Sequence, residues 1–143
     1  MKRAASPTVA LAASLVMLAG CGSNSISPVA EYRAASDAYF AAQRHFTTAI
    51  SALLPPVNNP GALASAGSTF TDAIKAFDSA ILAIPFAGKA KTDAADLASA
   101  NAALIGDIGL GLNTTGTNLI NDEGKVQLDF NALNTDLGLP LPT

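Results

Sequence analysis

The sequence has few of the residues on which metal binding, redox chemistry and covalent cross-linking depend. It contains one cysteine, Cys21, one histidine, His45, and no tryptophan. A single cysteine excludes a disulfide within the chain, so the fold must be stabilised by packing. A metal site needs three or four converging ligands, and a haem-attachment sequence needs two cysteines before a histidine; the sequence supplies neither. We therefore expect no cofactor, no metal and no enzymatic activity.

Charged residues are also scarce, at 13% of the chain, and the formal net charge is −3. Lys2 and Arg3 precede residue 21, whereas every acidic residue follows it, so the remainder of the chain is mildly acidic. Nucleic-acid binding requires clustered cations that displace counterions from phosphate, and the sequence has no such cluster. We expect no nucleic-acid partner.

The N-terminal residues combine two cations with a short apolar segment. Lys2 and Arg3 come first, and an apolar run from Val9 to Leu18 follows. About 20 apolar residues are needed to cross a ~30 Å hydrocarbon core, so this run is too short for a permanent transmembrane helix. Its length and its flanking charges are typical of a signal peptide. The run ends in the motif Leu18, Ala19, Gly20 and Cys21.

This motif resembles the lipobox of bacterial lipoproteins. The resemblance implies cleavage after residue 20, a diacylglycerol joined to the thiol of Cys21, and an amino group that can be acylated in turn, for example with palmitate. It also implies a lipid-anchored, extracytoplasmic protein of the cell membrane or outer envelope. The alternatives are an ordinary cleaved signal peptide, with Cys21 as a bystander thiol, or an uncleaved N-terminal anchor.

We divide the chain into a signal peptide (1–20), a lipidated cysteine and flexible tether (21–28), one helical domain (29–138) and a C-terminal tail (139–143). The mature length suits a single domain. Gly22 to Ser27 has the composition of a flexible coil that spans only about 13–15 Å, so the domain must sit close to its membrane. Ser27 and Pro28 are suited to the cap and the first position of a helix.

Two long segments, 29–54 and 61–84, carry the same pattern of large and small residues. The large residues recur every seven positions: Tyr32, Tyr39, Phe46 and Leu53 in the first segment, and Leu63, Phe70, Phe77 and Ile84 in the second. Alanine follows the first three of each set three places later: Ala35, Ala42, Ala49, Ala66, Ala73 and Ala80. On helices these residues form one stripe, and the alanines let a neighbouring helix approach closely.

A third helix is predicted to begin between Phe86 and Thr92 and to carry a thinner apolar stripe. That stripe consists of Ala90, Ala94, Leu97, Leu104, Ile105 and Ile108, with Asn101 among them. We expect the helix to rotate Asn101 outward; the alternative is a buried hydrogen-bonding residue that fixes register.

Glycines weaken helix formation between Gly106 and Thr117, because each costs ~1 kcal/mol relative to alanine. A long loop or frayed helix end is predicted there. A fourth helix is predicted from about Thr117 to Leu137, with one apolar face formed by Leu119, Val126, Phe130, Leu133 and Leu137. Gly138, Pro140 and Pro142 should end it.

Four amphipathic segments joined by short connections predict an all-α, up-down-up-down four-helix bundle. The alternative is a three-helix core with residues 106–117 and part of the fourth segment loosely docked. His45 directly precedes a residue of the first stripe, so we expect it on the surface. Two acidic pairs, Asp93 with Asp96 and Asp122 with Glu123, should lie on solvated helix faces.

These features favour a non-enzymatic, membrane-anchored envelope lipoprotein that presents a helical bundle to a protein partner in or near the same membrane. The alternative is a carrier that opens along the glycine-rich third connection and holds a small apolar ligand or lipid between its helices.

Replacing Cys21 by Ser should abolish acylation and block lipoprotein-specific cleavage, because both reactions depend on the thiol. Metabolic labelling with a fatty-acid analogue should label the wild type but not Cys21→Ser, and gel mobility should show that the variant remains a precursor. Ser23→Ala, which keeps the motif intact, should label like the wild type. A wild-type protein that never labels would contradict the lipoprotein interpretation.

Overall fold

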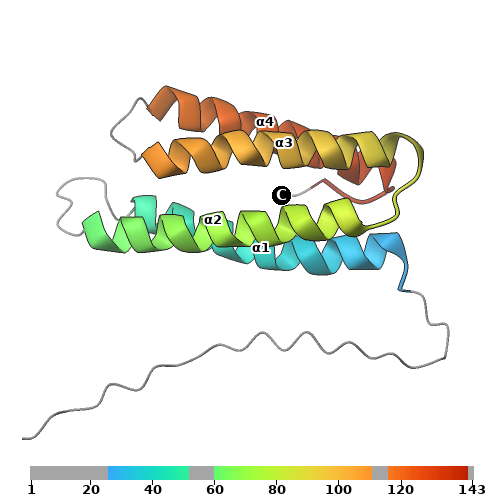
Figure 1. The fold of residues 1–143 in the computed structure, drawn as a ribbon, viewed down its shortest axis with the longest axis horizontal. Helices are drawn as coiled ribbons and strands as arrows, with labels where there is room; N and C mark the ends of the chain where they lie inside the picture. The colour runs from blue at the N-terminus through green and yellow to red at the C-terminus, as the bar shows by residue number, and fades with distance from the viewer. Residues whose placement is uncertain (1–25, 52–59, 111–115, 142–143) are drawn as a thin grey trace, which may run out of the picture.

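Four long helices account for nearly all of the chain that the structure describes. The computed structural model describes residues 26–51, 60–110 and 116–141, and within these ranges it contains no strand. The helices are α1 (Pro28–Ser51), α2 (Pro60–Ala83), α3 (Gly88–Leu110) and α4 (Gly116–Asp136). Each runs antiparallel to the helix before it (Figure 1). The prediction of an all-α, up-down-up-down four-helix bundle is confirmed.

Several predicted features lie outside the described residues. These are the signal peptide (1–20) with Leu18, Ala19 and Gly20 of the lipobox, Cys21, most of the tether, and Leu53. None of the helices that the structure describes is long and apolar enough to cross a membrane.

The start of α1 follows the predicted capping pattern. The backbone N–H of Ala30 donates to Oγ of Ser27 at 3.2 Å, and that of Glu31 donates to the Ser27 carbonyl at 3.0 Å. Pro28 occupies the first helical position. A backbone N–H there would have no partner within the helix, so the proline costs no hydrogen bond. Ser27 and Pro28 therefore fix the point at which the helix begins.

The end of α4 is fixed by a glycine in the left-handed conformation. Gly138 has φ of 66°, which side chains other than glycine rarely adopt. Its N–H donates to the Thr135 carbonyl at 3.1 Å, and the N–H of Leu139 donates to the Asn134 carbonyl at 2.8 Å. This is the Schellman arrangement of a helix C-terminus. It turns the chain back, so that Leu139 packs against the core.

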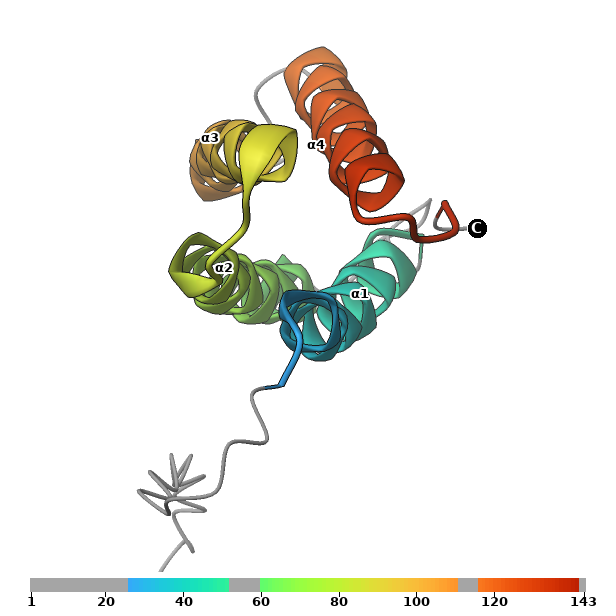
Figure 2. The ribbon, with the colours of Figure 1, turned by 90° about the vertical axis from the view of Figure 1, so that its right-hand side faces the viewer.

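The two heptad stripes face the interior, as predicted. The large residues that are buried are Tyr32, Tyr39, Phe46, Phe70, Phe77 and Ile84, while Leu63 is partly buried. Ala66 is buried, and the other five alanines of the pattern are partly buried. Small residues between the large ones allow the backbones of α1 and α2 to lie side by side along the bundle (Figure 2).

All eight aromatic side chains of the protein belong to one connected cluster, which we call the aromatic cluster. It comprises Tyr32, Tyr39, Phe40, Phe46, Phe70, Phe77, Phe86 and Phe130. Tyr39 lies at its centre, with ring centroids 5.0 Å from both Phe77 and Phe130 and 5.6 Å from Phe70. Edge-on and tilted ring pairs at these distances add to the stabilisation from burial alone.

The helices α1 and α4 are held apart by this cluster. Within the described ranges, no Cα atom of α1 lies within 8 Å of a Cα atom of α4, whereas α2 approaches both α1 and α3, and α3 approaches α4. Figure 2 shows the wider spacing. Phe130 of α4 fills the interval with ring centroids 5.0 Å from Tyr39 and 5.1 Å from Phe40. Side chains alone therefore close this side, which we call the α1–α4 seam.

The predicted loop at 106–117 is wrong at both ends, because α3 continues to Leu110 and α4 begins at Gly116. Residues 111–115 lie outside the described ranges. Burial explains the continuation of α3: Ile105 and Ile108 pack against the core, and this gain outweighs the glycine cost. Gly67 of α2 allows that approach, since a Cβ there would lie 3.3 Å from Cγ2 of Ile108.

Phe46→Ala and Phe77→Ala should each lower the free energy of unfolding by about 3–5 kcal/mol, the usual cost of deleting a buried ring. Urea denaturation followed by circular dichroism measures this. His45→Ala, at the exposed position beside Phe46, should change the same quantity by less than ~0.5 kcal/mol. Losses below about 1 kcal/mol at both phenylalanines would show that the stripes are not the core.

Candidate functional site

The histidine and the paired acidic residues of the sequence do not converge on one site. His45 is exposed on α1, as predicted. Asp96 is exposed as expected, whereas Asp93 is buried, contrary to the expected solvated face, with Nζ of Lys89 2.8 Å from its carboxylate. The same Nζ lies 3.3 Å from the carboxylate of Asp136 and so links α3 to α4. Across the residues the structure describes, no three His, Cys, Asp or Glu side chains form a group that could hold a metal ion.

The second acidic pair also separates. Glu123 accepts a long hydrogen bond of 3.5 Å from Nε2 of Gln43 across the α1–α4 seam. Asp122 instead lies beside Asp107 of α3. Desolvation and then the neighbouring Asp107 carboxyl raise the pKa of Asp122. Each acid therefore serves a contact with a different helix, and the two do not form a catalytic pair.

Asn101 is buried, so the prediction that it rotates outward is wrong. Its side chain has 0% exposure and forms two hydrogen bonds with other helices. Nδ2 of Asn101 donates to Oδ1 of Asp78 on α2 at 2.6 Å, and the Tyr39 hydroxyl of α1 donates to Oδ1 of Asn101 at 3.4 Å. A buried amide needs such partners. They come from two other helices, which the pattern of α3 alone did not reveal.

Burial raises the pKa values of the two titratable groups in this network, Asp78 and Tyr39. Desolvation raises the pKa of Asp78 to about 6, and the hydrogen bond from Asn101 offsets part of the rise. The pKa of Tyr39 lies far above its usual value because of burial and then because of the negative charges of Asp78 and Glu123. Tyr39 is therefore a neutral hydrogen-bond donor throughout the physiological range.

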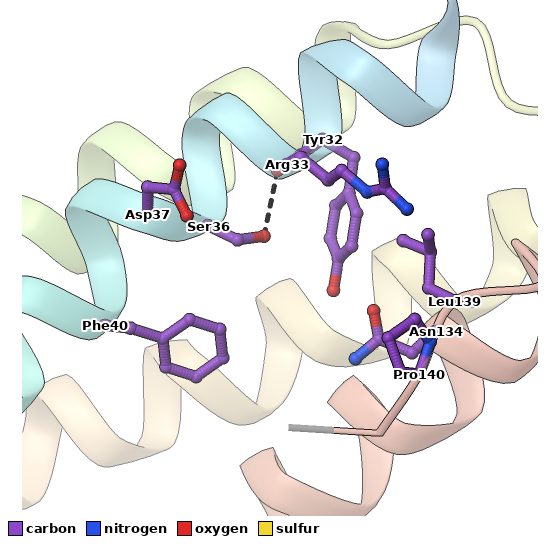
Figure 3. Close-up of a pocket in the computed structure, with 8 residues that line it drawn as sticks. All are labelled: Tyr32, Arg33, Ser36, Asp37, Phe40, Asn134, Leu139 and Pro140. Carbon is purple, nitrogen blue, oxygen red and sulfur yellow. Dashed lines mark hydrogen bonds between the residues drawn. The ribbon is translucent and has the colours of Figure 1, made fainter. Parts of the chain in front are cut away.

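Two cavities lie along the α1–α4 seam, one on each side of the Phe40–Phe130 ring pair. The first has a volume of about 280 Å³ and is lined by Tyr32, Arg33, Ser36, Asp37, Phe40, Asn134, Leu139 and Pro140 (Figure 3). The second has a volume of about 210 Å³ and is lined by Gln43, Phe46, Thr47, Ile50, Phe70, Leu104, Leu119, Ile120 and Glu123. Both are mainly apolar with a few polar groups, as small-ligand sites are, and both are smaller than the usual ~300–1,000 Å³ of such sites.

A narrow arc of α4 opposite its buried stripe has no charged residue, and the exposed Lys125, which pairs with Asp129, lies at its edge. At 100° per residue, one arc contains six residues whose exposure the structure describes: Asn131 is partly buried, and Ile120, Gly124, Leu128, Asn121 and Thr135 are exposed. We call these five residues the outer face of α4. Ile120 and Leu128 are 69% and 68% exposed, and a Cβ at Gly124 would meet nothing within 4 Å. Two large apolar side chains thus flank an open glycine on a neutral surface.

Comparison with known proteins gives no match: no family model, no curated protein and no solved structure matches the chain. The case for function therefore depends on the geometry of the bundle.

Asp78→Asn should stabilise the protein at pH 7 by about 1 kcal/mol, with allowance for solvent screening at this half-buried carboxyl. The folded-state pKa of about 6 exceeds the unfolded value of about 3.9, so the native state binds the proton more tightly. The wild type should therefore gain stability as the pH falls from 6 to 4, and the variant should lack this gain.

Urea titrations at pH 4.5 and 7 measure the difference. Asp72→Asn, at an exposed position on the same helix, serves as the matched control and should behave like the wild type. Equal pH dependence in the wild type and in Asp78→Asn would contradict the assignment.

Proposed function

We propose that the protein is a non-enzymatic lipoprotein of the bacterial cell envelope, anchored through Cys21, whose bundle binds a partner protein through the outer face of α4. The observation that carries this proposal is the exposure of Ile120 and Leu128 on one neutral arc of the helix. Large apolar side chains grouped on a surface often mark an interaction site. Docking would remove both from water.

The outer face suits a helix of the partner. Ile120 and Leu128 are eight residues apart, about 12 Å along the axis at ~1.5 Å per residue, which is slightly more than two helical turns. Gly124 between them leaves room for a second backbone to approach closely. Because the face has no charge, the partner should present an apolar, uncharged helical stripe. An acidic or basic stripe would lose its hydration without gaining an ion pair.

The anchor limits where that partner can be. A coil from Gly22 to Ser27 spans only about 13–15 Å, and α1 begins directly after it at Pro28. Lipidation of Cys21 would therefore hold the bundle close to the membrane surface. The partner should lie in or beside the same membrane.

The second candidate is a carrier of a small apolar ligand, and the two cavities of the α1–α4 seam favour it. In the described ranges, α1 and α4 are the one pair of adjacent helices whose backbones do not approach closely. Side chains alone close the gap between them. Side chains can move aside at lower cost than packed helix backbones. The second cavity includes Leu119 and Ile120 in the first turns of α4, close to the third connection that the carrier hypothesis invoked.

Crosslinking in intact envelopes, followed by purification and mass spectrometry, tests docking. The wild type should capture one envelope protein, and the double variant Ile120→Lys/Leu128→Lys should lose this product about tenfold or more. Leu82→Lys is the matched control, because Leu82 of α2 is 59% exposed but lies outside the outer face. It should retain the product, and thermal melting should show that all variants fold.

Three outcomes would contradict docking. Equal capture by the double variant and by Leu82→Lys would show that the outer face is not the site. Crosslinks to lipid alone would show that this face rests on the membrane. A protein without a crosslinked partner that instead yields an extractable lipid, and melts higher when that lipid is added, would be a carrier.

A further inference from the structure

The Tyr32 hydroxyl is a buried polar group without a hydrogen bond. Tyr32 is 2% exposed, and its hydroxyl has no partner among the described residues. Ser36 lies close by; its Oγ donates to the backbone carbonyl of Tyr32 at 2.8 Å and forms no hydrogen bond with the Tyr32 hydroxyl. Nearly all buried polar groups in folded proteins are paired, and an unpaired one costs about 1–3 kcal/mol. The hydroxyl therefore has unused hydrogen-bonding capacity, and because its oxygen is itself buried, a ligand can reach it only when neighbouring side chains shift.

The first cavity of the α1–α4 seam adjoins this hydroxyl. Figure 3 shows the phenol directed toward Asn134, with Phe40 on one side and Leu139 and Pro140 on the other. The turn at Gly138 places Leu139 and Pro140 there. The floor thus offers a phenol and a carboxamide, and the walls are apolar. At ~30 Å³ per water, a volume of about 280 Å³ holds roughly nine waters, or a ligand of about ten non-hydrogen atoms.

The mouth of the cavity carries a cation that is free to bind an anion. Arg33 is exposed and has no ion-pair partner in the part of the chain that the structure describes. Its guanidinium extends toward Leu139, and Asp37, one turn further along α1, is a second charged residue of the same lining (Figure 3). A guanidinium favours a carboxylate, with which it forms paired hydrogen bonds.

We propose that this cavity binds a small phenolic acid, with its hydroxyl at Tyr32 and Asn134, its ring against Phe40 and Pro140, and its carboxylate at Arg33. Burial raises the pKa of Tyr32 to about 12, so this residue stays a neutral phenol that can donate or accept. The site narrows the carrier candidate to one ligand class. It is independent of docking through the outer face of α4.

Isothermal titration calorimetry on the full chain in lipid nanodiscs tests the site with three probes. 4-Hydroxyphenylacetate has both polar ends, phenylacetate lacks the hydroxyl, and tyramine carries an ammonium in place of the carboxylate. The wild type should bind 4-hydroxyphenylacetate about tenfold more tightly than phenylacetate, the usual effect of one hydrogen bond to a buried group. Tyramine should bind more weakly than either acid.

Two variants test which residue contacts each end of the probe: one at Tyr32 for the hydroxyl and one at Arg33 for the carboxylate. Tyr32→Phe should remove the preference for the hydroxylated acid, and Arg33→Gln should weaken both acids about fivefold. Arg44→Gln, an exposed arginine of α1 outside the cavity, is the matched control and should bind both acids as the wild type does. Because Arg33 is exposed, its variant should fold even if Tyr32→Phe does not.

The proposal is wrong if the wild type binds neither acid, if tyramine binds more tightly than the acids, or if the hydroxyl preference survives in Tyr32→Phe. Failure here is distinguishable from failure of docking, since Ile120→Lys/Leu128→Lys should bind 4-hydroxyphenylacetate as the wild type does. A variant that loses the crosslinked partner but keeps the probe would separate the two sites.

Discussion

Contact among aromatic rings around Tyr39 is the interaction on which the rest of this structure depends. With no disulfide possible within the chain, stability must come from burial, and aromatic rings make up about half of the large buried apolar side chains. Alanines alternate with the rings between α1 and α2, so those backbones approach closely. No such alternation separates α1 from α4, where Phe130 meets both Tyr39 and Phe40. The unequal spacing of the four helices follows from this difference in side-chain size.

Tyr39, the central ring of the aromatic cluster, also accounts for the buried polar network. Tyr39 brings a hydroxyl into the core together with its ring, and a buried hydroxyl must find a partner. Asn101 accepts from it and donates to Asp78, so one polar chain joins α1, α2 and α3. The arrangement is satisfied in only one relative position of these helices. The network therefore specifies the register of α1, α2 and α3. This specificity has a cost, because the Asp78 carboxylate is partly removed from water.

The helix α4 contributes to both surfaces to which we assign binding, and its two sides are chemically different. Its outer face is uncharged and exposes two large apolar side chains, of which Ile120 also borders the second cavity. Its C-terminal turn, fixed by Gly138, closes one end of the α1–α4 seam and forms part of the cavity beside Tyr32. A protein partner and a small acid would thus reach the same helix from different sides. Neither surface contains residues of the heptad stripes other than Tyr32.

The sequence by itself determined the number of helices, their order and the inward face of α1 and α2, because heptad spacing and alanine placement act within a single helix. It also determined the ends at Ser27 and Gly138, where capping is a local property of a few residues. Tertiary structure decided the burial of Asn101, since its partners lie on other helices. It also decided that α3 continues past Gly106, because the packing of Ile108 against Gly67 outweighs local propensity. The spacing of α1 from α4, and with it the cavity beside Tyr32, depends on ring contacts between residues some ninety positions apart, and no local pattern encodes that distance.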